Sequence, residues 1–209
     1  MTAANCATMI RPRQDRPDLD EVTLVARSQD GDAKAFERLV DRYQGPLFRL
    51  ALGMVRDRGW AEDIVQDALI TAWRHIAGLS SPEAFPRWIY QITTRRTLNQ
   101  LRSRQRRPAD TTDPSLLDRD QRPGTHTEPA VPTGPTDPAM IAEEHALNDA
   151  LQTEVGNLPD DLRVCWILYA NHDRSYAEIG GIVGITHSAV RGRIARARHQ
   201  LAEEMTPWR

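Results

Sequence analysis

The stretch Ser175–Arg198, SYAEIGGIVGITHSAVRGRIARAR, decides how the C-terminal part of this 209-residue chain folds. Its Ser175 is typical of a helix N-cap, and Glu178 stands three residues later, where a capping-box partner belongs. Gly184 predicts the end of this first helix, because glycine adopts the left-handed conformation found beyond a helix C-terminus. Thr186 predicts the cap of a second helix. Two short helices joined by a tight turn form a helix-turn-helix.

Apolar residues give each of these two helices one face to bury. Ile179 and Ile182 share a face of the first helix, and Val190 and Ile194 stand four apart in the second. Gly180 lies where the two helices would cross, and we expect its missing side chain to let them approach closely.

The second helix is strongly basic. It holds four arginines, has a histidine at each end and contains no acid between them: Arg191, Arg193, Arg196, Arg198, His187 and His199. Such a helix can enter a major groove with its N-terminal half against base edges, while flanking arginines hold phosphates. The alternative is a solvent-exposed basic helix of an unrelated bundle, and the spacing favours DNA binding.

Positive charge is sorted into two patches, although the net charge is only −2. Residues 85–107 hold seven arginines and no acid, and residues 186–199 hold four more arginines. With those eleven charges set aside, the rest of the chain carries a net charge of −13. Local fields of this kind attract a polyanion better than the total charge suggests.

Composition argues against several classes of protein. Cys6 and Cys165 predict neither a disulfide framework nor a zinc site, and we expect Cys165 and the nearby His172 to be structural. No catalytic triad or glycine-rich phosphate loop is visible, so we expect neither an enzyme nor a cofactor. The first residues lack the apolar core of a signal peptide, and no stretch approaches the roughly 20 apolar residues of a membrane span. We therefore expect a cytoplasmic protein without membrane insertion.

Helical periodicity predicts an all-α fold in two helical domains. The first covers residues 18–107 and the second residues 139–209, after a flexible tail over residues 1–17. A linker over residues 108–138 carries seven prolines and no apolar period, which predicts a flexible, proline-rich tether. In the first domain we expect a helix from Asp18, one from Asp32 with a kink or break at Gly45-Pro46, one over Trp60–Ala77 and one over Glu83–Ser103.

Two helices of the first domain have polar faces of opposite charge. The third carries an acidic and amide cluster that, from charge alone, reads as an ordinary solvated face: Glu62, Asp63, Gln66 and Asp67. The fourth interleaves arginines with Trp88 and Tyr90, a pattern that suits single-stranded nucleic acid, where bases stack on rings. The alternative is that these two aromatic residues belong to the core, which we favour for Trp88.

The order of these features resembles the extracytoplasmic-function (ECF) group of sigma factors, the small initiation subunits of bacterial RNA polymerase. An acidic-faced helix (Ala61–Trp73) precedes a basic aromatic one (Phe85–Ile92); a linker, Leu158-Pro159 and the helix-turn-helix follow. The resemblance covers residues 18–107 and 140–205, and it implies a sigma domain 2 followed by a sigma domain 4. It also implies three partners: core polymerase, promoter DNA and a separate anti-sigma factor.

The resemblance assigns residues to three surfaces. Asp63, Gln66 and Asp67 match the surface that docks on the clamp coiled coil of the polymerase β′ subunit, and the β subunit is a further implied contact. The −10 element matches Ser80, Ser81, Trp88, Gln91, Arg95, Arg96, Asn99 and Arg102. The −35 element matches Ser175, His187, Ser188, Arg191, Gly192, Arg193, Ala195, Arg196 and Arg198. Of these, Arg191 and Arg196 fall where the family contacts the element, and Arg193 and Arg198 are better placed for phosphates.

The chain departs from the family at some of these positions. The family usually has Asn where this chain has Arg95, Asp where it has Asn99, and a small polar residue in place of Gly192. The −10 base preference therefore stays open. Two rivals also remain from the residues alone: a stand-alone helix-turn-helix regulator, which would bind its operator as a dimer, and a nucleic-acid-processing enzyme.

Overall fold

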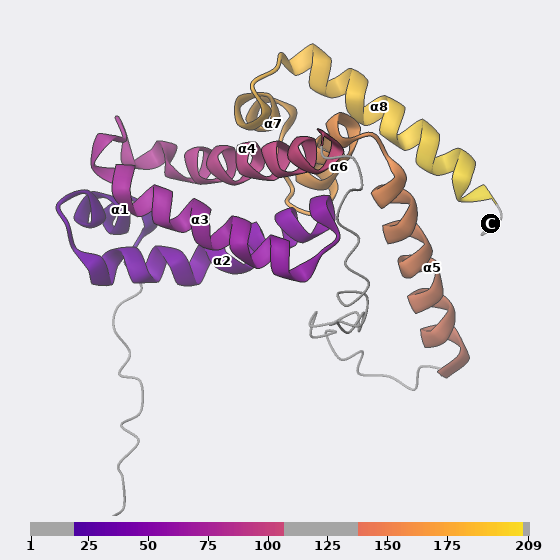
Figure 1. Cartoon of the computed structure of the whole chain (residues 1–209), viewed down its shortest axis with the longest axis horizontal. Coiled ribbons are helices and arrows are strands. Elements are labelled where there is room, and N and C mark those ends of the chain that lie inside the picture. The colour runs from indigo at the N-terminus through magenta and orange to yellow at the C-terminus, as the bar shows by residue number, and fades with distance from the viewer. Residues whose placement is uncertain (1–18, 107–137, 207–209) are drawn as a thin grey trace, which may run out of the picture.

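The structure, a computed structural model, describes residues 19–106 and 138–206, and these fold entirely into helices and turns (Figure 1). The all-α prediction is therefore confirmed for this part of the chain. The predicted tail, residues 1–17, and all but the last residue of the predicted linker, residues 108–138, lie outside the described residues.

The N-terminal body is a bundle of four α-helices with two 3₁₀ turns between the last two. Its elements are α1 (Glu21–Gln29), α2 (Ala33–Val55), α3 (Arg58–His75), η1 (Ile76–Gly78), η2 (Pro82–Ala84) and α4 (Phe85–Arg106). An aspartate caps each of the first three helices: the side chains of Asp20, Asp32 and Asp57 each accept a hydrogen bond from a first-turn backbone N–H. These caps satisfy donors that a helix start leaves unpaired.

Helix α2 runs unbroken through Gly45-Pro46, so a break there is the wrong alternative. Proline removes one backbone hydrogen bond and normally disrupts a helix interior. Here the residues on both sides bury the same face, since Tyr43, Leu47 and Leu50 are all in the core. Tertiary packing of that face outweighs the local penalty, as is usual for helices in proteins.

The core of the N-terminal body surrounds α2, and Phe85 at the start of α4 closes one side of it. Phe85 is 1% exposed and meets the Tyr43 ring edge-on, with 5.4 Å between centroids. Trp73 is 39% exposed and covers Phe36 from outside, at 5.0 Å between ring centroids. A large ring at a helix end can cover the core rim without being enclosed by it.

The C-terminal body contains the predicted helix-turn-helix. Its helices are α5 (Pro138–Asn157), α6 (Asp160–Ala170), α7 (Tyr176–Val183) and α8 (His187–Glu204). The capping box of Ser175 and Glu178 is present, Gly184 is left-handed at φ 80°, and Thr186 caps α8 by accepting from the Ala189 N–H. A Cβ on Gly180 would stand 2.7 Å from the Ile185 carbonyl oxygen, so the expected close approach at this glycine is confirmed.

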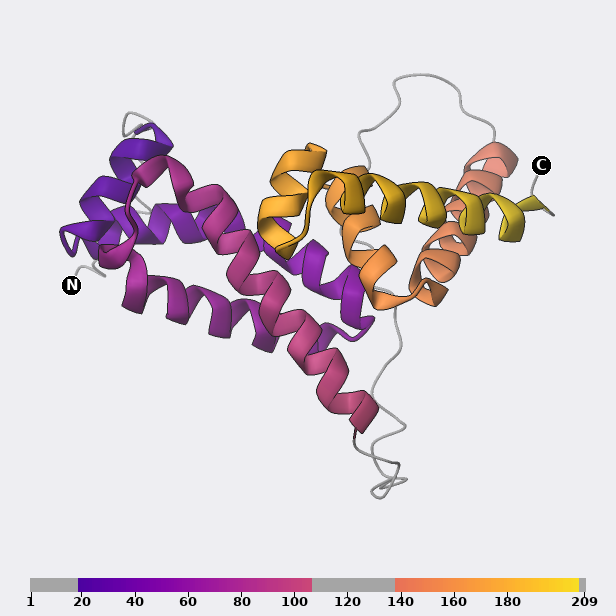
Figure 2. The same cartoon turned by 90° about the horizontal axis from the view of Figure 1, so that it is seen from above.

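The two bodies lie against each other. Helix α7 lies beside α4, and α6 packs against the C-terminal half of α2 (Figures 1 and 2). Gly53 of α2 makes room for Ile167 of α6, because a Cβ at position 53 would stand 3.0 Å from the Ile167 Cδ1. Arg163 of α6 donates to the Met54 carbonyl oxygen at 2.7 Å. Buried residues of both bodies form one continuous apolar cluster.

Candidate functional site

Helix α8 presents the predicted −35 residues on its exposed side. Val190, Ile194 and Leu201 are buried, which fixes the rotation of the helix about its axis. The residues between them point away from the protein: His187, Ser188, Arg191, Gly192, Ala195 and Arg196 are all exposed. The free face of α8 therefore carries two arginines without an acidic neighbour in the helix.

The two arginines predicted for phosphates are held by α6 from the flank. Arg193 Nε lies 3.3 Å from the Asp161 Oδ2, and Arg198 Nη2 donates to the Tyr169 hydroxyl at 2.9 Å. Neither contact could be predicted from the sequence. They orient both guanidinium groups beside the exposed face. Ser175, also in the −35 set, lies at the start of α7, where its side chain takes part in the capping box.

Cys165 lies beneath this surface and is fully buried and free. Burial raises the pKa of its thiol, so the neutral form is favoured. This agrees with the structural role expected for Cys165. Among the described residues, no three His, Cys, Asp or Glu side chains come together as a metal site.

The predicted polymerase-docking residues lie on the exposed face of α3. Asp63, Gln66 and Asp67 line a cleft of about 490 Å³ between α3 and α4. The same cleft is lined by Arg96 and Asn99, two residues of the predicted −10 set. The structure thus brings together side chains that the family resemblance assigns to two different surfaces.

An apolar hollow borders this face and was not predicted from the sequence. It measures about 530 Å³ and lies between α2 and α3, with Phe48, Val65 and Leu69 as its apolar lining. Gln66 lines both the hollow and the polar cleft. In the sequence these residues belong to the faces of two separate helices. They form a hollow only because α2 packs on α3.

The predicted −10 residues fall into four environments. Ser80, Arg95, Asn99 and Arg102 are exposed, and Ser81 donates to the Glu83 carboxylate. Trp88 is half-buried and packs on the core residue Phe85, at 6.0 Å between ring centroids, so the core position favoured from the sequence is met only in part. Arg96 is bound to α3, where Asp67 and Thr71 accept from its guanidinium.

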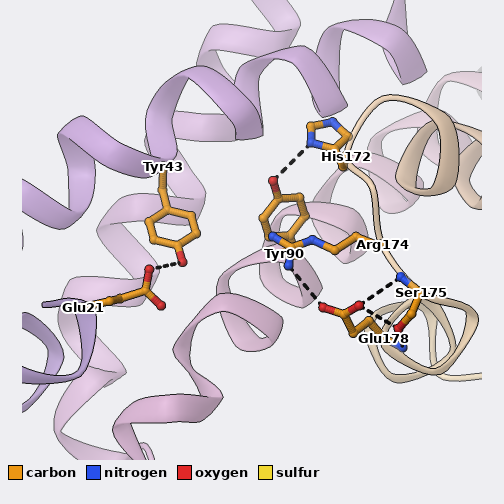
Figure 3. Close-up of polar contacts among 7 residues, drawn as sticks. All are labelled: Glu21, Tyr43, Tyr90, His172, Arg174, Ser175 and Glu178. Atoms are coloured by element: carbon orange, nitrogen blue, oxygen red, sulfur yellow. Dashed lines mark hydrogen bonds and ion pairs between the residues drawn. The ribbon is translucent and has the colours of Figure 1, made fainter.

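Gln91 occupies the fourth environment, the junction of the two bodies, where its neighbour in the sequence is Tyr90. The Gln91 amide donates to the Gly181 carbonyl oxygen of α7 at 3.3 Å. The Tyr90 hydroxyl lies 3.1 Å from the His172 Nδ1, and the Arg174 guanidinium stands 4.6 Å above the Tyr90 ring (Figure 3). Tyr90 is 3% exposed, so the alternative that assigned it to the core is the correct one.

This junction continues into both bodies. Toward α7, Arg174 binds Glu178 of the capping box at 3.2 Å. Toward α2, the Tyr90 ring meets Tyr43, whose hydroxyl donates to Glu21 at 2.7 Å (Figure 3). The capping box is therefore connected through Arg174 to the aromatic core of the N-terminal body.

None of the described helices combines the length and the apolar character needed to cross a bilayer.

Comparisons with known proteins place both bodies in one family. Residues 39–107 match Sigma-70 region 2, and residues 148–201 match Sigma-70, region 4. The RNA polymerase sigma-H factor of Pseudomonas aeruginosa is 32% identical over 184 residues, which is 88% of this chain and 93% of that protein. The ECF RNA polymerase sigma-E factor of Escherichia coli K12 is 33% identical over 190 residues, which is 90% of this chain and 96% of that protein.

Solved structures share the fold at lower identity. The sigma factor RpoE, crystallised with the anti-sigma factor NepR from Bartonella quintana, has a TM-score of 0.62 at 22% identity, covering 83% of this chain and 98% of its own. CnrH, in complex with the cytosolic domain of CnrY, has a TM-score of 0.61 at 22% identity, with coverages of 88% and 95%. The two family models match separate regions of the chain, whereas these relatives match 88–90% of it at 32–33% identity. The chain belongs to the sigma-70 family and is one of its ECF sigma factors.

Proposed function

We propose that this protein binds core RNA polymerase and directs it to promoters by reading a −10 and a −35 element. The observation that carries the proposal is the pair of modules in one chain, each with an exposed polar surface. One presents the basic free face of α8, and the other presents the acidic face of α3 beside the basic helix α4. In this role the protein is a cytoplasmic specificity subunit and not itself an enzyme.

For the −35 element, α8 enters the major groove with its exposed face against the bases. Arg191 and Arg196 are the base-reading candidates because both are exposed on the free side. Arginine pairs bidentately with guanine, and each such contact discriminates by about 1–3 kcal/mol. Arg193 and Arg198 flank the groove and neutralise phosphates.

For the −10 element, exposed residues of α4 and its preceding loop hold the separated strand. Arg95 and Arg102 supply charge, and Trp88 supplies a half-buried ring at the surface. Capturing an unstacked base offsets an unstacking free energy of a few kcal/mol. Base identity at this element depends on Arg95 and Asn99, where the chain departs from the family.

For core polymerase, Asp63, Gln66 and Asp67 form the docking face toward the β′ clamp coiled coil. Asp63 and Asp67 keep exposed carboxylates there, which suits a basic partner surface. The bordering apolar hollow supplies area that a partner side chain can fill. We further propose that a separate anti-sigma factor controls the protein; RpoE, which shares its fold, was crystallised in complex with the anti-sigma factor NepR. Affinity purification from the native cell should recover such a partner.

The function is tested by measuring binding to duplex promoter DNA with the chain alone, core polymerase alone, and both together. One or two bidentate contacts give weak binding alone, so we expect core polymerase to be required for tight, promoter-selective binding. A promoter affinity of the chain alone that core polymerase does not improve would contradict the proposal. A footprint over two symmetric half-sites would instead support the stand-alone dimeric regulator.

A further inference from the structure

The connection between α3 and α4 carries two residues of the proposed −10 set, Ser80 and Ser81. It consists of the two 3₁₀ turns, η1 and η2, and Leu79 after the first turn is extended at φ −72° and ψ 124°. Fixing the backbone of each residue in such a segment costs conformational entropy. Contacts from outside the segment are therefore needed to hold it in one conformation.

Gln29, the last residue of α1, supplies such a contact. Its side-chain amide nitrogen donates to the Leu79 carbonyl oxygen at 2.8 Å and to the Ile76 carbonyl oxygen at 3.2 Å. An amide nitrogen carries two hydrogens, so one side chain can hold both ends of the η1 turn. Because the Leu79 carbonyl belongs to the peptide unit that joins Leu79 to Ser80, Gln29 fixes the backbone that leads into the −10 residues.

Helix α1 is a firm support for this side chain. Leu24 and Val25 are fully buried against the bundle, and the Tyr43 hydroxyl of α2 donates to Glu21 in the first turn of α1 at 2.7 Å. Figures 1 and 2 both show α1 beside the connection between α3 and α4. A side chain on a well-packed helix positions its partner more precisely than one on a loop does.

The alternative is that Gln29 only stabilises the end of its own helix. Its neighbour Ser28 has that role, because its buried hydroxyl donates to the Leu24 carbonyl oxygen within α1 at 2.7 Å. The two bonds of Gln29 instead reach across 47 and 50 positions of the sequence, and both end on the same connection. The two neighbours thus hold different parts of the molecule, which makes Ser28 a matched control for Gln29.

We infer that Gln29 is a positioning residue for the −10 element, which holds the connection in the conformation that presents Ser80 and Ser81 to the separated strand. This inference rests on the proposed function, in which these serines take part in −10 recognition. Gln29 itself does not touch DNA. Without its two bonds the connection samples other conformations, and the apparent affinity for the −10 strand falls with the fraction of protein that is correctly arranged.

The test compares the full-length wild type with three variants. Gln29→Met removes the donor and keeps the side-chain length, Gln29→Lys keeps a donor on a long side chain, and Ser28→Ala removes the hydrogen bond within α1. Gln, Met and Lys have similar helix propensities, so the changes at position 29 do not weaken α1. Each protein is mixed with core polymerase and barcoded templates in which the −10 or the −35 element of a promoter selected by the wild type is randomised. Sequencing the transcripts gives the selectivity for each element separately.

Gln29→Met should lower the −10 selectivity by about fivefold, because a smaller fraction of the protein presents the serines correctly. Its −35 selectivity and its co-elution with core polymerase should be unchanged. Gln29→Lys should recover most of the −10 selectivity, and Ser28→Ala should leave both selectivities unchanged. An unchanged −10 selectivity in Gln29→Met, an equal loss in Ser28→Ala, or an equal loss at both elements would each overturn the inference.

Hydrogen exchange of the chain alone tests the positioning role without polymerase or DNA. The Leu79 amide, which donates to the Ile76 carbonyl oxygen at 3.0 Å, should exchange about threefold faster in Gln29→Met than in the wild type. Amides of α8 should exchange at the same rate in both proteins. Equal exchange at Leu79 would overturn the inference. If the wild type starts no transcript with core polymerase, the proposed function fails instead, and the exchange result still decides the positioning role.

Discussion

The Arg96 guanidinium and the Asp67 carboxylate form an ion pair of 3.0 Å between Nη1 and Oδ2, which joins α4 to α3. Asp67 belongs to the face proposed for core polymerase, and Arg96 belongs to the set proposed for the −10 element. A partner that binds the Asp67 carboxylate therefore competes with Arg96 for it. The two proposed surfaces meet at this ion pair.

Replacing Gln66 and Asp67 together with arginine should abolish association with core polymerase, because it reverses the charge of the docking face. The fold should survive, since an exposed ion pair such as Asp67–Arg96 contributes only about 0.2–1 kcal/mol. Gel filtration with core polymerase measures the association. Glu203→Arg with Glu204→Arg, at the end of α8, is the control, because it adds at least as much positive charge away from the docking face. Co-elution of the Gln66/Asp67 variant with core polymerase would refute the docking face.

Arg191→Ala should weaken −35 recognition by about 1–3 kcal/mol, or roughly 5- to 150-fold, by removing one base contact. Core binding should be unchanged, because the residue lies on the free face of α8. Run-off transcription from the native promoter and from one with an altered −35 element measures the effect, which should vanish on the altered promoter. Arg74→Ala, which removes the same charge from α3, is the control. An equal loss on both promoters would reassign Arg191 to phosphate contact.

Gly180→Ala should destabilise the protein by about 1–3 kcal/mol, because the added methyl group would overpack against the Ile185 carbonyl in the turn between α7 and α8. Gly192→Ala should instead stabilise it by up to about 1 kcal/mol, because this glycine lies within a helix with no atom near its missing Cβ. Urea denaturation compares the free energies of unfolding. If both variants change the free energy of unfolding by the same amount in the same direction, the close approach at Gly180 does not contribute to stability.

Acid should lower the free energy of unfolding through His172. Burial, aided by Arg49 and Arg174, lowers the pKa of His172 from 6.5 to about 4. When the protein unfolds, the ring regains its usual pKa and takes up a proton that the folded state excludes. The free energy of unfolding therefore falls as pH drops from about 6.5 to about 4, and His172 contributes no pH dependence well above pH 7.

His172→Gln isolates this contribution. The groups that face the ring are Tyr90, Arg49, Arg174 and Asp173, and all of them stay in place in the variant. The unfolding free energy of the wild type should fall more steeply than that of the variant between pH 7 and pH 5. His75→Gln should follow the wild type. Parallel curves for wild type and His172→Gln would mean that the ring is not held neutral by burial.

Local features of the fold could be predicted from the sequence because they depend on near neighbours in the chain. The capping box at Ser175, the left-handed Gly184 and the buried pair Val190 and Ile194 each follow from residues at most four apart. Pro46 shows the limit, since its local penalty is outweighed by packing that the sequence does not display.

Contacts between distant segments could not be predicted. Tyr90 and His172 are 82 positions apart, and nothing in either neighbourhood marks them as partners. The same holds for Arg193 with Asp161, and for the cleft that joins Asp67 to Asn99. The exposed site residues were identified by resemblance to the family, and their packing partners came only from the structure.

Run-off transcription with core polymerase over a library of upstream sequences tests the central claim most directly. With the chain present, transcripts should start from a subset of templates that share two separated elements, and core polymerase alone should not select them. An absence of chain-dependent transcripts from every template, or selection that core polymerase achieves alone, would contradict the account.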